Sequence, residues 1–308
     1  MKFVRAFCKE LNSQLSPYRA RELYLNEDSD LFGQELTFLC EDPNCRARLT
    51  PVGIYMARRS KRVLHFRSRE EHLSSCGYIQ SSGSGRRSED TPKKEDDYKL
   101  THFPTELLLT SPSRIRGGVG SGPVIDIDNE DSTNSSNGSP RGSKQQTKTR
   151  TPYLDWVVDC FLFGDEESKS GRFTIANKTK PFNKFFKKVQ YFGDEPGLIY
   201  YGPIDDMRLY KGGDIGLRFK DFAWQEGKRY RIWAYISAET IDHSRRKRAF
   251  RTEMEELKKA FDQGEEVEAF FVGSYPEKKK VDDKPGSSFE VFHAEMVNID
   301  HLFVVFSK

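Results

Sequence analysis

One stretch in the middle of the chain strongly constrains its domain organisation. Residues 81–150 contain 11 apolar side chains in 70 positions, against 25 serines, glycines and prolines. So little apolar surface cannot offset the conformational entropy that is lost when a segment folds. We therefore expect a flexible linker at 81–150, between a small domain at 1–80 and a larger α+β domain at 151–308.

The remaining composition excludes a fully disordered chain and a membrane-spanning protein. Hydrophobic residues make up 36% of the whole chain, and the shortfall is concentrated in the linker. No run approaches the ~18 apolar residues that a membrane span needs. Lys9 and Glu10 interrupt the short apolar run near the N-terminus, so no signal peptide is predicted. These features favour a cytoplasmic protein that does not contact membranes.

The larger domain is predicted to be rich in β-sheet, with a barrel-like sheet as one arrangement. Its strand candidates carry aromatic and β-branched residues and are separated by Gly, Pro and Asp. A helix is expected at 244–261, where Phe250, Met254, Leu257 and Phe261 recur on one face. A short helix is expected at 181–191, and 153–163 fits either a helix or a buried strand. The predicted strands are 198–201, 215–219, 230–236, 267–272, 289–294 and 302–306.

One island in the linker has the composition of folded chain. Residues 99–110 read KLTHFPTELLLT, an apolar motif within a Ser/Gly-rich tether. Such motifs often dock on a partner protein or on a domain of their own chain. The alternative is a strand or helical turn that belongs to the first domain. A protein partner is expected to bind either this island or the 151–308 domain.

Four residues of the first domain have the spacing of a zinc site. Cys40 and Cys45 form one close pair, and His72 and Cys76 form a second pair after a loop of 26 residues. Zinc favours tetrahedral Cys and His ligands that are paired in this way, and four protein ligands make a site structural. On a helix, His72 and Cys76 would face the same side. His65 is an alternative histidine ligand.

The competing interpretation is a set of unrelated free thiols. Disulfides are not expected in a reducing compartment, so the five cysteines favour metal binding or burial. A domain of about 80 residues has a limited core and gains from a metal staple. We expect Zn²⁺ at the four-residue set, whereas Cys8 and Cys160 are expected to be ordinary core or surface thiols.

The segment LTFLCEDPNCRARLTPVG, followed by VLHFRSREEHLSSCG, resembles the N-terminal zinc-finger-like region of the competence protein CoiA-like families. Cys40, Cys45, His65-Phe66 and Cys76 match the order of the family motif, and the similarity covers about residues 20–78. The family tends to place a second histidine just after the His-Phe pair, where this chain has Ser68, and His72 comes later. The resemblance therefore leaves the choice between His65 and His72 open.

This resemblance implies a role in DNA processing, and such proteins often continue into a restriction-endonuclease-like domain. The corresponding Glu-x-Lys motif has one candidate here, Glu167-Ser-Lys169, which lies in a polar turn without the strand that the motif needs. An alternative function is therefore a metal-dependent nuclease or another DNA-processing enzyme. Its metal ligands would come from Asp205, Asp206, Asp214 and Glu290, whose spacing is not diagnostic. A second alternative is a protein-interaction scaffold.

Charge is one-sided in a single part of the chain. The net charge is only +3, yet the segment from Arg46 to Arg69 holds eight cations and no acid. Cations on a metal-stapled hairpin suit phosphate contacts, and the neighbouring Tyr55 and Phe66 could stack unpaired bases. We expect nucleic acid binding, with DNA preferred over RNA; the alternative is a solvated strand face or a patch that binds an acidic segment. The eight residues are Arg46, Arg48, Arg58, Arg59, Lys61, Arg62, Arg67 and Arg69.

A second basic cluster opens the helix expected at 244–261. Cations are unfavourable at a helix N-terminus, so an anionic partner there would relieve an electrostatic cost. That partner could be nucleic acid, or the side chains could point to water and pair with glutamates further along the helix. The candidate nucleic-acid-binding residues in this cluster are Arg245, Arg246, Lys247 and Arg248.

Overall fold

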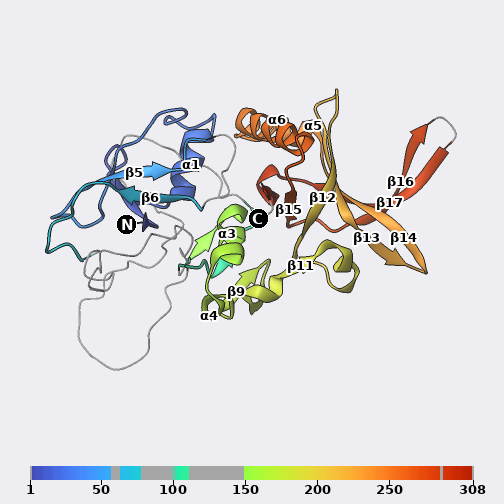
Figure 1. Cartoon of the computed structure of the whole chain (residues 1–308), viewed down its shortest axis with the longest axis horizontal. Coiled ribbons are helices and arrows are strands. Elements are labelled where there is room, and N and C mark those ends of the chain that lie inside the picture. The colour runs from blue at the N-terminus through green and yellow to red at the C-terminus, as the bar shows by residue number, and fades with distance from the viewer. Residues whose placement is uncertain are drawn as a thin grey trace.

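The structure is a computed structural model, and it describes residues 2–56, 63–77, 100, 102–110, 149–284 and 287–306. The fold is mixed α and β and rich in sheet, and the described residues form three separate sheets. The N-terminal sheet and α1 lie at one end, α3 lies in the middle, and the long strands β12, β13 and β14 lie at the other end (Figure 1).

The N-terminal sheet has six antiparallel strands in the order β1-β6-β5-β4-β2-β3. Its core face buries Phe38, Leu49 and Phe66. Helix α1 (Pro17–Leu25) begins at Ser16, whose side chain accepts a hydrogen bond from the backbone of Arg19, as favoured at an N-cap. The strands are β1 (Lys2–Phe3), β2 (Ala6–Cys8), β3 (Ser13–Leu15), β4 (Phe38–Leu39), β5 (Arg48–Val52) and β6 (His65–Ser68).

A second sheet of four strands includes part of the island that the sequence placed in the linker. Its order is β10-β9-β7-β8, with β7 (Glu106–Leu107) between β8 (Arg150–Thr151) and β9 (Arg172–Ile175). The edge strand is β10 (Lys178–Pro181). Residues 102–110 also contact the C-terminal part of the chain, because the His301 Nε2 atom lies 2.8 Å from the carbonyl oxygen of Leu109. The described part of this island therefore lies against the larger domain.

The close approach of this segment to Gly164 gives a first prediction. A Cβ atom on Gly164 would lie 2.2 Å from the Phe103 ring and 2.3 Å from the carbonyl oxygen of Cys160. We expect Gly164→Ala to lower the free energy of unfolding by about 1–3 kcal/mol, because overpacking forces the chain to shift. Denaturant unfolding measures the loss. Gly193→Ala is the control, because no atom lies within 4 Å of a Cβ at Gly193, and an equal loss there would contradict the packing account.

The third sheet has eight strands and contains all six predicted strands of the larger domain. Its order is β16-β17-β14-β13-β12-β15-β18, and β11 pairs with β12 beside this path. Within the described residues no ladder joins the two ends of the path, so the sheet is open and not a closed barrel. The strands are β11 (Phe186–Lys188), β12 (Ile199–Leu209), β13 (Ile215–Gln225), β14 (Lys228–Ile236), β15 (Val267–Phe271), β16 (Glu277–Lys284), β17 (Ser287–Met296) and β18 (Leu302–Phe306).

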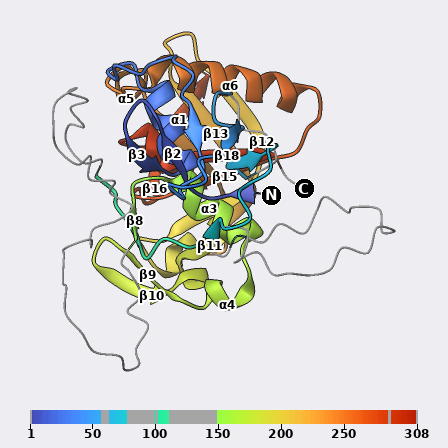
Figure 2. The same cartoon turned by 90° about the vertical axis from the view of Figure 1, so that its left-hand side faces the viewer.

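Helices pack around these sheets. The ambiguous segment 153–163 forms a helix, α3 (Leu154–Phe163), and the predicted helix 244–261 is confirmed as α6 (Lys247–Asp262). The helix expected at 181–191 is wrong: two 3₁₀ turns, η1 (Phe182–Phe185) and η2 (Val189–Asp194), flank β11 instead. The other helices among the described residues are α4 (Glu166–Lys169), α5 (Ala238–Asp242) and η3 (Ile299–His301). In Figure 2, α6 lies on the opposite side of the molecule from β9, β10 and α4.

The N-terminal sheet has a hydrophobic core of its own, and a few buried residues of the N-terminal part join the core of the larger domain. Tyr18, Val63 and Leu64 belong to the same buried cluster as the residues of the eight-stranded sheet. The Tyr18 hydroxyl also donates a 2.6 Å hydrogen bond to Asp159, and both side chains are buried. This contact fixes α1 against α3, so the N-terminal sheet is held in a defined position on the larger domain.

Candidate metal centre

The four predicted ligands come together beside the N-terminal sheet. The donor atoms of Cys40, Cys45, His72 and Cys76 all lie within 4.8 Å of one another, close enough to hold a metal ion. Cys40 directly follows β4, and Cys45 lies in the turn after it. His72 and Cys76 lie on the segment after β6, which contains a turn at residues 74–75. Within the described residues this is the one cluster of three or more such ligands.

The distances within the cluster are those of ligands around a shared ion. The sulfur atoms of Cys40 and Cys76 lie 3.7 Å apart, far more than the about 2.05 Å of a disulfide. The His72 Nδ1 atom lies 3.4 Å from the Cys45 sulfur and 3.6 Å from the Cys76 sulfur. The His72 Nδ1 atom therefore faces the thiols of Cys45 and Cys76, and the Cys40 thiol lies beside that of Cys76.

The histidine of the cluster is His72. Its ring stacks on Phe3, with ring centroids 5.1 Å apart, and this contact turns Nδ1 toward the thiols. The Nε2 atom is buried and has no hydrogen-bond partner among the described residues. His65 is buried on β6 with its Nδ1 atom 2.9 Å from the carbonyl oxygen of Val63, and it is not part of the cluster.

Without a cation, burial opposes ionisation of the Cys40 thiol. Burial raises the pKa of Cys40 to about 12, and the neighbouring Cys76 thiol adds to the increase. Burial also acts to raise the pKa of Cys45, but backbone hydrogen bonds at Ala47 and Leu73 outweigh it and lower the value. Burial lowers the pKa of His72, which favours the neutral imidazole that binds metals. A bound cation would compensate the charge of the thiolates and reverse this cost.

Asp42 ties the two ligand segments together, a role that spacing alone did not predict. One carboxylate oxygen accepts a hydrogen bond from the backbone of Asn44 at 2.9 Å, and the other accepts one from Gly77 at 3.2 Å. Arg46 donates to the carbonyl of Cys40 at 3.2 Å. The signal that could have indicated Asp42 is its place in the turn between two cysteines, where an Asp commonly accepts backbone hydrogen bonds.

Cations cover the outer face of the same sheet. Arg67 lies opposite Lys2 on one side and Thr50 on the other, and Arg48 lies on the next strand. Lys2, Arg48 and Arg67 are exposed, whereas the alternate residues face the core. Arg46 lies 3.6 Å from the centroid of the Phe7 ring. Arg69 is exposed just after β6, and the predicted residues Arg58, Arg59, Lys61 and Arg62 lie outside the described residues.

The second basic cluster faces acids of its own chain. Arg248 pairs with Glu27 at 3.3 Å and Arg245 pairs with Asp28 at 3.5 Å. Glu27 also accepts a 2.9 Å hydrogen bond from the backbone of Arg248, and so satisfies a free amide in the first turn of α6. Arg246 pairs with Asp300, and Lys247 is half-buried. The anionic partner expected at this helix end is therefore present within the chain.

A cavity of about 350 Å³ with both polar and apolar lining residues lies between α1, α3 and α6. Its charged lining includes paired groups: Arg19 donates to Glu22 at 2.7 Å, and Arg246 pairs with Asp300. Cations and carboxylates balance along its wall, so the cavity has no marked preference for an anionic or a cationic ligand.

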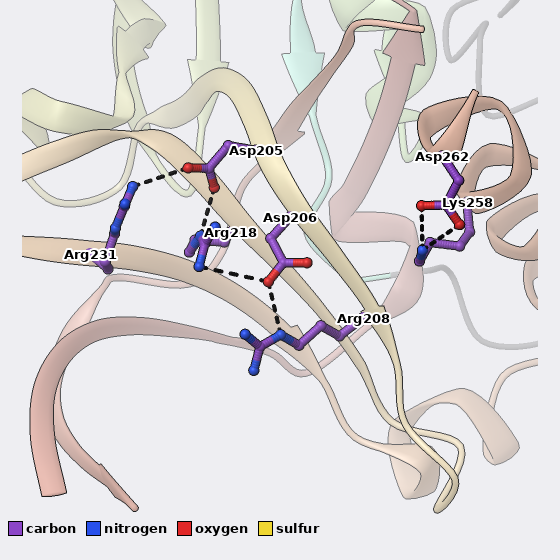
Figure 3. A network of polar contacts seen from close by, with 7 residues as sticks. All are labelled: Asp205, Asp206, Arg208, Arg218, Arg231, Lys258 and Asp262. Atoms are coloured by element: carbon purple, nitrogen blue, oxygen red, sulfur yellow. Dashed lines mark hydrogen bonds and ion pairs between the residues drawn. The ribbon is translucent and has the colours of Figure 1, made fainter. Parts of the chain in front are cut away.

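The carboxylates considered for a nuclease site have other partners. Asp205 accepts from Arg218 at 2.6 Å and from Arg231 at 3.0 Å, and Asp206 accepts from Arg208 at 2.8 Å (Figure 3). Asp214 accepts from the backbone of Ala238, and Glu290 pairs with Lys278. Glu167 and Lys169 lie on the short helix α4. The carboxylates are therefore engaged in separate contacts and do not converge on one ion.

Comparison with known proteins does not identify a family for this chain. No family model and no curated protein matches the chain. Within the described residues, no helix is both long enough and apolar enough to cross a membrane.

Proposed function

We propose that this chain is a nucleic-acid-binding protein whose N-terminal sheet is held together by a structural zinc ion. The observation that carries the proposal is the convergence of three thiols and one imidazole on segments that adjoin the cationic strands β5 and β6. DNA is the expected polymer. The larger domain positions this sheet, and the resemblance to the CoiA-like zinc-finger-like region agrees with the same assignment.

Zinc suits the donor set and its dimensions. Bond lengths of about 2.3 Å to sulfur and about 2.0–2.1 Å to nitrogen, in a tetrahedron, place sulfurs about 3.8 Å apart and sulfur and nitrogen about 3.6 Å apart. The distances here are 3.7 Å between Cys40 and Cys76, and 3.4 and 3.6 Å from the thiols to His72. Four protein ligands leave no open position for substrate, which supports a structural role.

The cationic outer face supplies phosphate contacts. Arg48 and Arg67 are exposed on adjacent strands of a sheet whose opposite face is buried, so their backbone positions are fixed. Each phosphate neutralised by such a group releases counterions and strengthens binding at low salt. The zinc ion would join the loop that leads into β5 to the segment that follows β6, and so keep the cations of these two strands on one surface.

Charge reversal on this face tests the proposal. We expect Arg48→Glu combined with Arg67→Glu to weaken DNA binding about tenfold or more and to reduce the salt slope by about two, because two phosphate contacts are lost. Fluorescence anisotropy of a labelled duplex and a labelled single strand, at several salt concentrations, measures both quantities.

A matched control distinguishes the loss of cations on this face from the change in net charge of the protein. Lys211→Glu combined with Lys259→Glu changes net charge by the same amount at exposed lysines of the larger domain. We expect the control to bind almost as tightly as wild type. The proposal fails if the wild-type chain binds no nucleic acid, or if the arginine variant binds as tightly as the wild type.

A further inference from the structure

We propose that the outer face of β13 and β14 stacks the bases of a single nucleic-acid strand, an inference that rests on the proposed function. This face is separate from the cationic face of the N-terminal sheet. It lies on the eight-stranded sheet at the far end of the molecule (Figure 1). Its side chains alternate between aromatic rings and arginines.

The alternation along β14 separates two faces completely. Tyr230, Ile232, Ala234 and Ile236 are buried in the core. The intervening side chains point to the opposite face and are exposed or half-buried. These outward residues are Arg229, Arg231, Trp233 and Tyr235.

The neighbouring strand β13 continues the same pattern. Trp224 lies opposite Arg229, Phe222 lies opposite Arg231, and Arg218 lies opposite Trp233. Trp224 is 71% exposed, an unusual position for the largest apolar side chain. Aromatic and arginine side chains therefore pair across the two strands at three successive positions.

The arginines lie against the rings and are held there by two aspartates. Arg208 and Arg218 lie 4.9 and 5.7 Å from the Trp233 ring centroid. Asp205 and Asp206 accept hydrogen bonds from these guanidinium groups, as Figure 3 shows. A guanidinium plane that is fixed in this way offers a base a flat surface, as an aromatic ring does.

Phe222 forms a second such unit. Arg231 lies 4.0 Å and Arg229 lies 4.8 Å from its ring centroid. Arg231 is held by Asp205 at 3.0 Å, so one aspartate connects the two units.

The chemistry of the face favours a polyanion with flat, unpaired groups. Arg208, Arg218, Arg229 and Arg231 outnumber Asp205 and Asp206, so the network keeps positive charge. Bases of a single strand are free to stack on such rings, whereas those of a duplex are already stacked on one another. A single strand is therefore the occupant that fits both the charge and the rings.

Tryptophan emission provides a direct test on the full chain. The chain has three tryptophans, and Trp224 and Trp233 lie on this face, whereas Trp156 is buried. We expect an oligothymidylate of about 15 nucleotides to quench the emission, and a duplex of equal length to quench it much less. Trp224→Ala combined with Trp233→Ala should weaken single-strand affinity about tenfold or more without changing the salt slope.

Two further variants keep the test decisive. Trp224→Ala alone removes a mostly exposed ring, so it is expected to fold and to show a smaller loss. Tyr191→Ala removes a 53% exposed ring on η2 and should leave binding unchanged. Unchanged single-strand affinity in both tryptophan variants, measured by fluorescence anisotropy of a labelled strand, would overturn this inference, even if charge reversal at Arg48 and Arg67 weakens binding. If the wild-type chain binds no nucleic acid, the proposed function fails as well. Oligonucleotide binding without quenching of the tryptophan emission would also overturn the inference. A protein would then be the alternative ligand for this face.

Discussion

Replacing Cys76 with serine should remove the metal and cost more stability than any surface change in the chain. Cys76 is fully buried, and its sulfur lies 3.7 Å from Cys40 and 3.6 Å from the His72 Nδ1 atom. Structural zinc contributes about 10–16 kcal/mol of apparent binding free energy in zinc-finger peptides, so losing one of four ligands should cost several kcal/mol. Metal analysis and thermal unfolding, followed by circular dichroism, measure the two effects.

Cys8→Ala is the matched control for this variant. Cys8 is also buried, but it lies on β2 outside the cluster. We expect the control to keep about one zinc ion per chain and to lose only the packing of a small side chain. A strong chelator should affect wild type and control alike and reproduce the Cys76 variant. Equal metal content in the Cys76 and Cys8 variants would contradict the assigned ligand set.

Phe182→Ala should strongly destabilise the larger domain. Phe182 is 1% exposed, and its ring contacts Phe103, Phe173 and Phe186 at centroid distances of 5.0, 4.9 and 5.4 Å. Truncation of a buried Phe leaves a cavity and costs about 3–5 kcal/mol. Because Phe103 belongs to the segment 102–110, we expect this segment to loosen first. Denaturant unfolding gives the global loss, and amide hydrogen exchange reports on 102–110.

Tyr191→Ala is the control for the Phe182 variant. Tyr191 lies on the adjacent turn η2 but is 53% exposed. Its loss should change the free energy of unfolding by no more than about 0.5 kcal/mol. A small effect at Phe182, or unchanged exchange in 102–110, would show that the aromatic cluster does not anchor this segment.

The metal cluster could be predicted because its signal is local. Two close ligand pairs separated by a loop need only the loop to fold back, so the spacing of Cys40, Cys45, His72 and Cys76 was sufficient. The choice between His65 and His72 was not local. The His72 ring stacks on Phe3, which lies on β1, far from His72 in the sequence.

Long-range contacts explain most of what the sequence did not reveal. The basic N-terminus of α6 is matched by Glu27, which is 221 residues away from Arg248. The lysines at 278–280 belong to the edge strand β16, where exposed lysines are common. The six apolar strands were predictable because their side chains carry the pattern of a buried sheet, whereas β16 lies at an edge and carries none.

Metal analysis of the purified full chain tests the central claim most directly. We expect about one zinc ion per chain, a value that falls close to zero in His72→Ala and is retained in His65→Gln. Cobalt substitution should give the absorption of a tetrahedral site with thiolate ligands. The account would be contradicted by a chain that takes up no zinc, or by zinc that remains bound when His72 is removed and is lost when His65 is replaced.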